Sequence, residues 1–153
     1  MKRFRCFLVA LVLVLVLGLF STKVYAAGTV SQTDKKVYGN VRVLTFTCTA
    51  DSSAHTFPVA ASEIDIDGFV FLVVTNPGTT APTDDYDITL TDADSVDIMG
   101  GELEDRDEAN SEQAVPLIDG VFGSRFVKGP LTITISNNSV NSAVTVVTVF
   151  YYR

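Results

Sequence analysis

From residue 41 to the C-terminus the chain alternates apolar and polar residues, in runs rich in Val, Ile, Thr, Phe and Tyr. Successive side chains of a strand point to opposite faces, so a period of two is typical of β-strands with one face toward a core. Gly, Pro, Asn and Asp, which favour turns, separate the runs. The sequence therefore predicts an all-β fold, a two-sheet antiparallel β-sandwich of about six to eight strands, jelly-roll-like or immunoglobulin-like in topology.

The runs also predict where individual strands lie. A polar lead over residues 27–36 is expected to precede a first strand over residues 37–50, and a short second strand is expected over residues 55–60. Residues 69–74 are apolar at every position, which predicts a strand covered on both faces. Further strands are expected over residues 86–91, over 96–99 as its hairpin partner, over 126–127 paired with 131–135, and over Val144–Tyr152.

Residues 1–26 have the order of a secretory signal peptide. A basic cluster, a short apolar stretch and two small residues follow one another at Lys2, Arg3 and Arg5, at residues 6–20, and at Val24 and Ala26. The apolar stretch is shorter than the roughly 20 residues that a membrane-spanning helix needs. We expect cleavage after Ala26 and a secreted or periplasmic domain; the alternative is an uncleaved N-terminal anchor. A single β-sandwich domain over 37–153 then follows the polar lead.

The charge of the remaining chain limits its partners. Residues 27–153 contain seven basic and 18 acidic residues, a net charge of −11 with His neutral. Nucleic-acid backbones and anionic membrane surfaces are bound chiefly through Lys and Arg. We therefore expect neither nucleic acid nor, after cleavage, membrane as a partner, and instead a protein partner or self-association.

Cys48 is the single cysteine outside the predicted signal peptide, because Cys6 lies within it. Leu44, Phe46 and Cys48 alternate with polar residues and fall on one face of a strand. The simplest interpretation is a small, buried, unpaired side chain. The alternatives are a thiol nucleophile and an intermolecular disulfide.

Enzymatic chemistry would depend on His55, the only histidine. A Ser-His-Asp hydrolase needs an imidazole that accepts the proton of the nucleophile. No Gly-x-Ser-x-Gly motif is present, and His55 follows a polar turn, as a surface or edge-strand residue would. A secreted hydrolase dependent on His55 is the third functional hypothesis, and no catalytic residue or cofactor is assigned.

Carboxylates gather at the two ends of the strand over residues 86–91. Ca²⁺ prefers six to eight oxygen ligands, so this region could form a Ca²⁺ site. The spacing departs from an EF-hand loop, since Val96 stands where a ligand belongs, and a solvated, turn-forming cluster is the simpler interpretation. The alternative hypothesis is thus a Ca²⁺-dependent binding domain that uses Asp84, Asp85, Asp87, Asp92, Asp94 and Asp97.

Residues 77–92 read PGTTAPTDDYDITLTD and are followed by a glycine pair at residues 100–101. This stretch resembles a family of small, uncharacterised bacteriophage and prophage proteins with the pattern P-G-x-x-x-P-T-x-x-Y-D-I-T-L-T-D. An Asp-Arg element at 105–106 and the G-P-L-T-I stretch at 129–133 continue the resemblance over most of the chain. It implies a β-structured virion or tail-associated component without assigned activity. The signal peptide departs from that context and favours an exported, cellular relative.

The leading hypothesis is an exported, non-enzymatic structural or interaction module. Val144–Tyr152 is apolar on both faces, which predicts a strand in the centre of its sheet. The end of that strand, residues 150–153, is expected to join a subunit contact, because aromatic side chains are enriched in such contacts.

Overall fold

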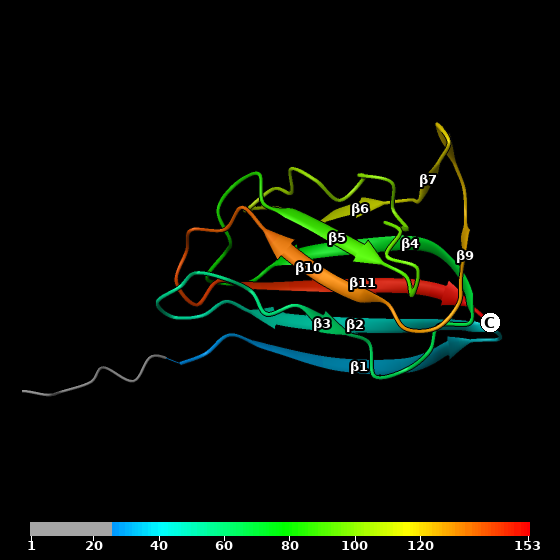
Figure 1. The fold of residues 1–153 in the computed structure, drawn as a ribbon, viewed down its shortest axis with the longest axis horizontal. Helices are drawn as coiled ribbons and strands as arrows, with labels where there is room; N and C mark the ends of the chain where they lie inside the picture. Colours follow the sequence, from blue (N-terminus) through cyan, green and yellow to red (C-terminus); the bar gives the residue numbers. More distant parts are fainter. Residues whose placement is uncertain (1–25) are drawn as a thin grey trace, which may run out of the picture.

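The computed structural model describes residues 26–153, which contain eleven β-strands (Figure 1). No helix within this part of the chain is long and apolar enough to cross a membrane. The predicted signal peptide lies outside the described residues except for Ala26. The strands are β1 Thr29–Tyr38, β2 Val41–Thr49, β3 Ala60–Ala61, β4 Gly68–Pro77, β5 Asp87–Thr91, β6 Glu112–Ala114, β7 Leu117–Ile118, β8 Val121–Phe122, β9 Arg125–Val127, β10 Thr132–Ser136 and β11 Val144–Tyr152.

Two antiparallel sheets form a sandwich, as the sequence predicted. The large sheet has the order β1-β2-β11-β4-β6, with β9 also pairing with β4, and the small sheet has the order β3-β10-β5. The small sheet lies in front of the large one in Figure 1. β7 and β8 form a separate hairpin that projects beyond the sheets.

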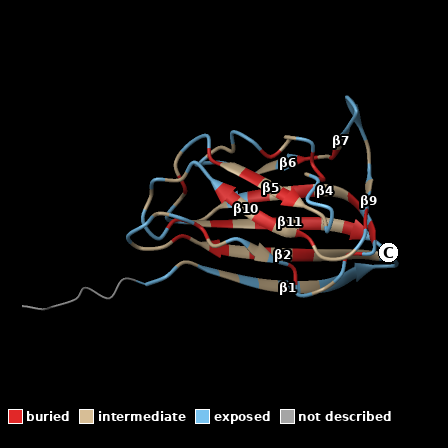
Figure 2. Ribbon diagram, viewed as in Figure 1, coloured by how far each residue is buried: buried red, intermediate tan, exposed pale blue. Residues whose placement is uncertain are grey.

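The core lies between the two sheets, where buried and less buried residues alternate along each strand (Figure 2). This alternation follows from the strand period of two. Loop residues such as Ile66, Met99 and Leu103 close the space around the small sheet. The inward residues of the longer strands are Leu44, Phe46 and Cys48 of β2, Val70 and Val73 of β4, Ile88 and Leu90 of β5, Ile133 and Ile135 of β10, and Val147, Val149 and Tyr151 of β11.

The N-terminal segment differs from the prediction. Most of the expected polar lead belongs to β1, and the expected strand over residues 37–50 is two strands joined by a turn at Gly39 and Asn40. β1 is an edge strand that contributes little to the core, so its sequence lacks an apolar row. Lys35 and Lys36 lie on this edge, where lysines discourage pairing with other chains.

The predicted strand over residues 55–60 is also wrong. His55 has a φ of +62°, in the left-handed region, which interrupts an extended chain. Only Ala60 and Ala61 pair, as β3 at the edge of the small sheet. The predicted hairpin strand over residues 96–99 is reduced to a single bridge between Thr91 and Asp97.

β9 and β10 do not pair with each other, contrary to the prediction. β9 pairs with β4 in the large sheet, whereas β10 pairs with β5 and β3 in the small sheet. Residues 128–131 therefore carry the chain from one layer to the other.

β11 lies in the centre of the large sheet, as predicted, with β2 on one side and β4 on the other. β4 likewise has paired strands along both edges. Both strands are thus satisfied in their backbone hydrogen bonding and differ only in what covers their two faces.

Candidate functional site

The large sheet has a second face that points away from the small sheet. Its side chains alternate with the buried ones, and most are half-buried by their neighbours on the sheet. We call this surface the outer face. It comprises Val41, Val43, Thr45, Thr47 and Thr49 of β2, Phe69, Phe71, Leu72, Val74 and Asn76 of β4, and Val144, Val146, Thr148, Phe150 and Tyr152 of β11.

One end of the outer face is aromatic because of an irregularity in β4. The β4–β11 register shifts between Phe150 and Tyr151, which leaves Phe71 as an extra residue. Such a bulge re-aims a side chain, and here Phe71 packs beside Phe150 and Tyr152 on the outer side, with ring centroids 6.3 and 5.7 Å away. The bulge thus adds an aromatic ring to this face.

The aromatic cluster is completed by Phe69 and by Phe126 of β9. The ring of Phe69 stacks on Tyr152 at 5.4 Å and meets the edge of Phe126 at 5.2 Å. Phe126 is 54% exposed, Phe69 40% and Tyr152 39%. Three neighbouring aromatic rings therefore present substantial apolar surface to solvent.

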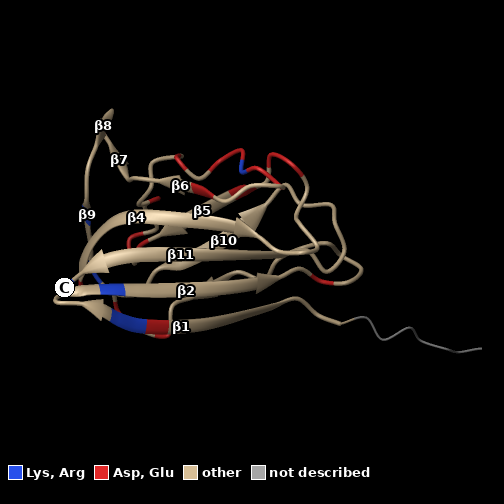
Figure 3. Cartoon of the chain, turned by 180° about the vertical axis from the view of Figure 1, so that it is seen from behind, with Lys and Arg blue, Asp and Glu red and all other residues tan. Residues whose placement is uncertain are grey.

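None of the 15 outer-face residues is charged. A typical protein surface is about 25–35% charged, so 15 surface positions would be expected to carry about four charged side chains. Figure 3 views this side of the molecule, and only Arg42 interrupts the uncharged surface of β2, β11 and β4. Arg42 points inward, because its Nε donates a hydrogen bond to the hydroxyl of buried Tyr151 at 3.0 Å.

No other segment of residues 26–153 crosses in front of β2 or β11 in Figure 3. The sequence predicted that residues 69–74 of β4 are covered on both faces. This is wrong for the described chain, because the outer side of Leu72 and Val74 has no second layer over it. Large uncovered apolar surfaces of soluble proteins mark interaction sites.

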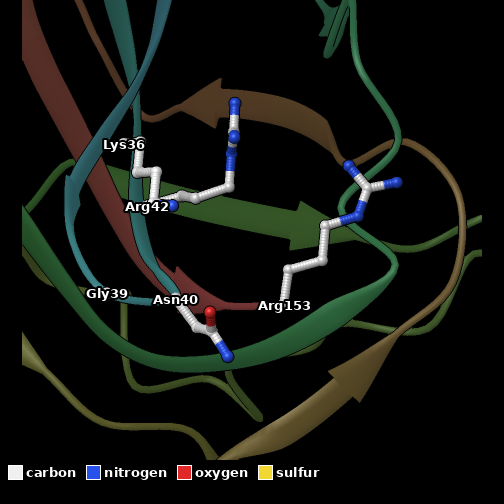
Figure 4. A pocket seen from close by; sticks show the side chains of 5 residues that line it. All are labelled: Lys36, Gly39, Asn40, Arg42 and Arg153. Atoms are coloured by element: carbon white, nitrogen blue, oxygen red, sulfur yellow. The ribbon is translucent and has the colours of Figure 1, made fainter.

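A second candidate is a small basic pocket where the β1–β2 turn meets the end of β11 (Figure 4). Its cavity of about 180 Å³ is lined by Lys36, Gly39, Asn40, Arg42 and Arg153. Arg42 is already paired with Asp34, and this hydrogen bond, followed by the one with Tyr151, raises the pKa of Arg42. Arg153 is paired with Asp67 at 3.3 Å. The pocket therefore has little positive charge left for an anion.

Cys48 lies at an inward position of β2 and is fully buried and free, which confirms the predicted strand phase. Burial raises the pKa of its thiol to about 12. The nucleophilic form of cysteine is the thiolate, so this thiol is unreactive near neutral pH. The position also argues against an intermolecular disulfide, since the sulfur does not reach the surface.

His55 lies in the turn between β2 and β3, rather than on a strand. Its Nδ1 is buried and has no hydrogen-bond partner among the described residues. A general base must reach the proton it accepts, and Nδ1 contacts no hydroxyl or thiol donor here. This geometry does not support the hypothesis of a hydrolase dependent on His55.

The six aspartates proposed for Ca²⁺ serve local turns. Asp92 accepts hydrogen bonds from the backbone of Asp94 and Val96, and Asp97 accepts them from Met99 and Gly101. Within the described part of the chain no three acidic, histidine or cysteine side chains gather closely enough to hold a metal ion. The arrangement fits the turn-forming interpretation better than a cation site. The remaining members are Asp84 and Asp85, both exposed, and Asp87, whose side chain binds the backbone of Asp105.

Comparisons with known proteins give distant likenesses only. No protein-family model and no curated protein matches the chain. A chain of the acidic stable capsid structure of Helicobacter pylori bacteriophage KHP30 is similar over 85% of this chain and 90% of its own, with 11% identity and a TM-score of 0.40. A cupin domain from Bordetella pertussis is similar over 84% and 98%, with 13% identity and a TM-score of 0.31. At these scores neither likeness bears on function.

Proposed function

We propose that this protein is an exported, non-enzymatic interaction module that docks through the outer face of its large sheet. The observation that carries the proposal is the combination of no charge and no cover on this face in a strongly acidic chain. An unpaired apolar sheet face is normally packed against another layer. The missing layer is supplied by a partner.

The composition of the outer face suits a protein contact. Interface centres are depleted in charge and enriched in aromatic residues. The aromatic cluster supplies large, rigid anchors, and the valines and threonines next to it supply a surface of short side chains. Asn76 is the only amide among the 15 residues, so docking would bury few polar groups.

The rival functions have less support. Cys48 and His55, the two side chains on which hydrolysis could rest, lack an accessible sulfur and a nearby proton donor, respectively. The aspartates of the Ca²⁺ hypothesis are engaged in their own turns. Export itself rests on the order of residues 1–26, and it places the partner outside the cytoplasm.

The test is photocrosslinking in cells that produce the protein from its full sequence. A photoreactive amino acid replaces Thr148, at the middle of the outer face, or Thr134, which occupies the outward side of β10 in the small sheet. The two positions are matched: each is a half-buried threonine on a central strand.

We expect a crosslinked product from position 148 and little from position 134, because the outer face is in contact with a partner and the small sheet is not. Products of equal yield at both positions, or none at position 148, would contradict the proposed function.

A further inference from the structure

We infer that the partner on the outer face is a second copy of this chain, so that two large sheets pack face to face in a four-layered dimer. This inference rests on the proposed function and adds the identity of the partner. A symmetric dimer uses the same surface on both subunits, so the surface must be compatible with itself. The outer face meets that condition because it carries no charge to oppose its own image.

The size of the outer face fits a dimer contact. Strands of nine residues are about 30 Å long and four neighbouring strands are about 19 Å wide, so the face covers on the order of 600 Å². Stable interfaces bury about 1,200–2,000 Å² in total, or about 600–1,000 Å² from each partner. Two such faces reach the lower end of that range before the relief of their side chains is counted.

The charge distribution favours a second copy over a basic partner. Two chains that each carry −11 over residues 27–153 repel each other wherever their carboxylates meet. The uncharged strands β2, β11 and β4 are the surface on which such copies approach with the least repulsion. A basic partner would instead seek the acidic loops, which Figure 3 shows beside β5 and β6.

The side-chain sizes on the outer face indicate the orientation. The strand register places Thr45, Thr148 and Val74 in one row across the middle of the sheet. The bulky rings of Phe69 and Tyr152 lie at one end of the strands, and short side chains fill the other. A two-fold axis in the interface plane and perpendicular to the strands places the rings of each copy opposite the short side chains of the other. Large-against-small packing keeps two sheets about 10 Å apart.

The experiment is sedimentation equilibrium of the protein produced from its full sequence, in the form that the host yields, from about 1 μM to 1 mM, which spans the usual range of weak to moderate affinities. It is done at low and high salt and with two matched variants, Thr148→Glu on the outer face and Thr134→Glu on the small sheet. Both variants add the same charge. If Thr148→Glu does not fold, Tyr152→Ser replaces it, with Val121→Ser on the exposed β7–β8 hairpin as control.

We expect the mass to approach twice that of one chain as concentration rises, with tighter association at high salt, because salt screens repulsion between acidic copies. Thr148→Glu should weaken association at least about tenfold, since it buries like charges against each other, and Thr134→Glu should leave it unchanged. A monomer at all concentrations and salts, or equal effects of both variants, would overturn the inference.

The photocrosslink from position 148 separates this inference from the proposed function. A product with the mass of two chains supports both. A product with a different protein keeps the proposed function and overturns the second copy as partner, and no product contradicts both.

Discussion

Phe46 and Cys48 are neighbouring inward residues of β2, and both are fully buried. Their burial could be predicted because strand phase is a local property that two or three alternating residues reveal. The left-handed backbone of His55 could not be predicted in this way, since it depends on the loop around it. Asn138 donates a side-chain hydrogen bond to the carbonyl of His55 from 83 residues away.

The buried thiol of Cys48 should make the protein less stable at alkaline pH. Its pKa is raised from 9.0 to about 12 by burial. Between these values the unfolded chain has lost the thiol proton and the folded chain keeps it, so the free energy of unfolding falls as pH rises, by about 1.4 kcal/mol per pH unit.

Urea unfolding at several pH values between about 9 and 11 measures this slope. Cys48→Ala should show a shallower fall, because the buried tyrosines Tyr86 and Tyr151 titrate in both proteins and only the thiol differs. Identical slopes would show that the thiol ionises freely in the folded state.

Phe46→Ala should reduce the free energy of unfolding by about 3–5 kcal/mol, because it leaves a cavity between the two sheets. Thr47→Ala, one residue further along and on the outer face, should cost no more than about 1 kcal/mol. Chemical denaturation of both variants tests the assigned faces of β2. A larger loss from Thr47→Ala would place the core on the wrong side of this strand.

Among the elements, β4 and β11 were predictable because central strands are apolar on both sides and long. β1 was missed because an edge strand carries mostly polar side chains, and the same composition describes a loop. The pairing of β9 with β4 was missed because nothing in a strand of three residues, Arg125–Val127, identifies a partner more than 50 residues away. Element type is thus encoded locally here, and sheet membership is not.

The outer face had a signal in the sequence, the valines and threonines that alternate with the core residues of β2. The reasoning from the sequence assigned the second apolar side of β4 to a cover within the chain. Only the arrangement of the two sheets shows that the single small sheet covers one face and leaves the other open.

The turn that leads from residues 97–101 toward β7 depends on Gly100. Its φ is +66°, and a Cβ there would meet the carbonyl oxygen of Leu117. Gly120, in the β7–β8 turn, has a φ of +78° with nothing within 4 Å. Gly100→Ala should therefore be more destabilising than Gly120→Ala, which bears only backbone strain of about 1–2 kcal/mol.

The difference between the two variants isolates the steric clash, for which about 1–3 kcal/mol is expected. Thermal unfolding of both measures it. Equal losses would mean that the turn at Gly100 moves away from Leu117 at no cost.

For the whole molecule, the separation of charge from apolar surface explains how an acidic chain remains soluble and still associates. The 18 acidic residues lie on the turns, the small sheet, its loops and the inward side of the β1 edge, and the outer face has none. The end of β11 was predicted to join a subunit contact. Tyr152 fits this expectation as part of the aromatic cluster, whereas Tyr151 belongs to the core, and its hydroxyl donates to Asp34 at 2.9 Å.

Export predicts a defined N-terminus. Because residues 1–26 have the order of a signal peptide, protein recovered from the periplasm or the medium should begin Ala27-Gly28-Thr29. N-terminal sequencing measures this. An intact Met1 on exported protein would instead indicate an uncleaved anchor, and retention in the cytoplasm would contradict export itself.

The central claim, that the outer face is covered by another molecule, is tested most directly without any substitution. A soluble paramagnetic probe relaxes the valine methyl groups that solvent reaches, and the measurement is repeated as the protein concentration rises. We predict that the methyl groups of Val43, Val74 and Val146 on the outer face become protected. Val59 and Val96, which are 63% and 42% exposed elsewhere, should stay unchanged. If all five respond alike, or if the three outer-face valines remain fully accessible at the highest concentration, the outer face is not the docking surface between copies.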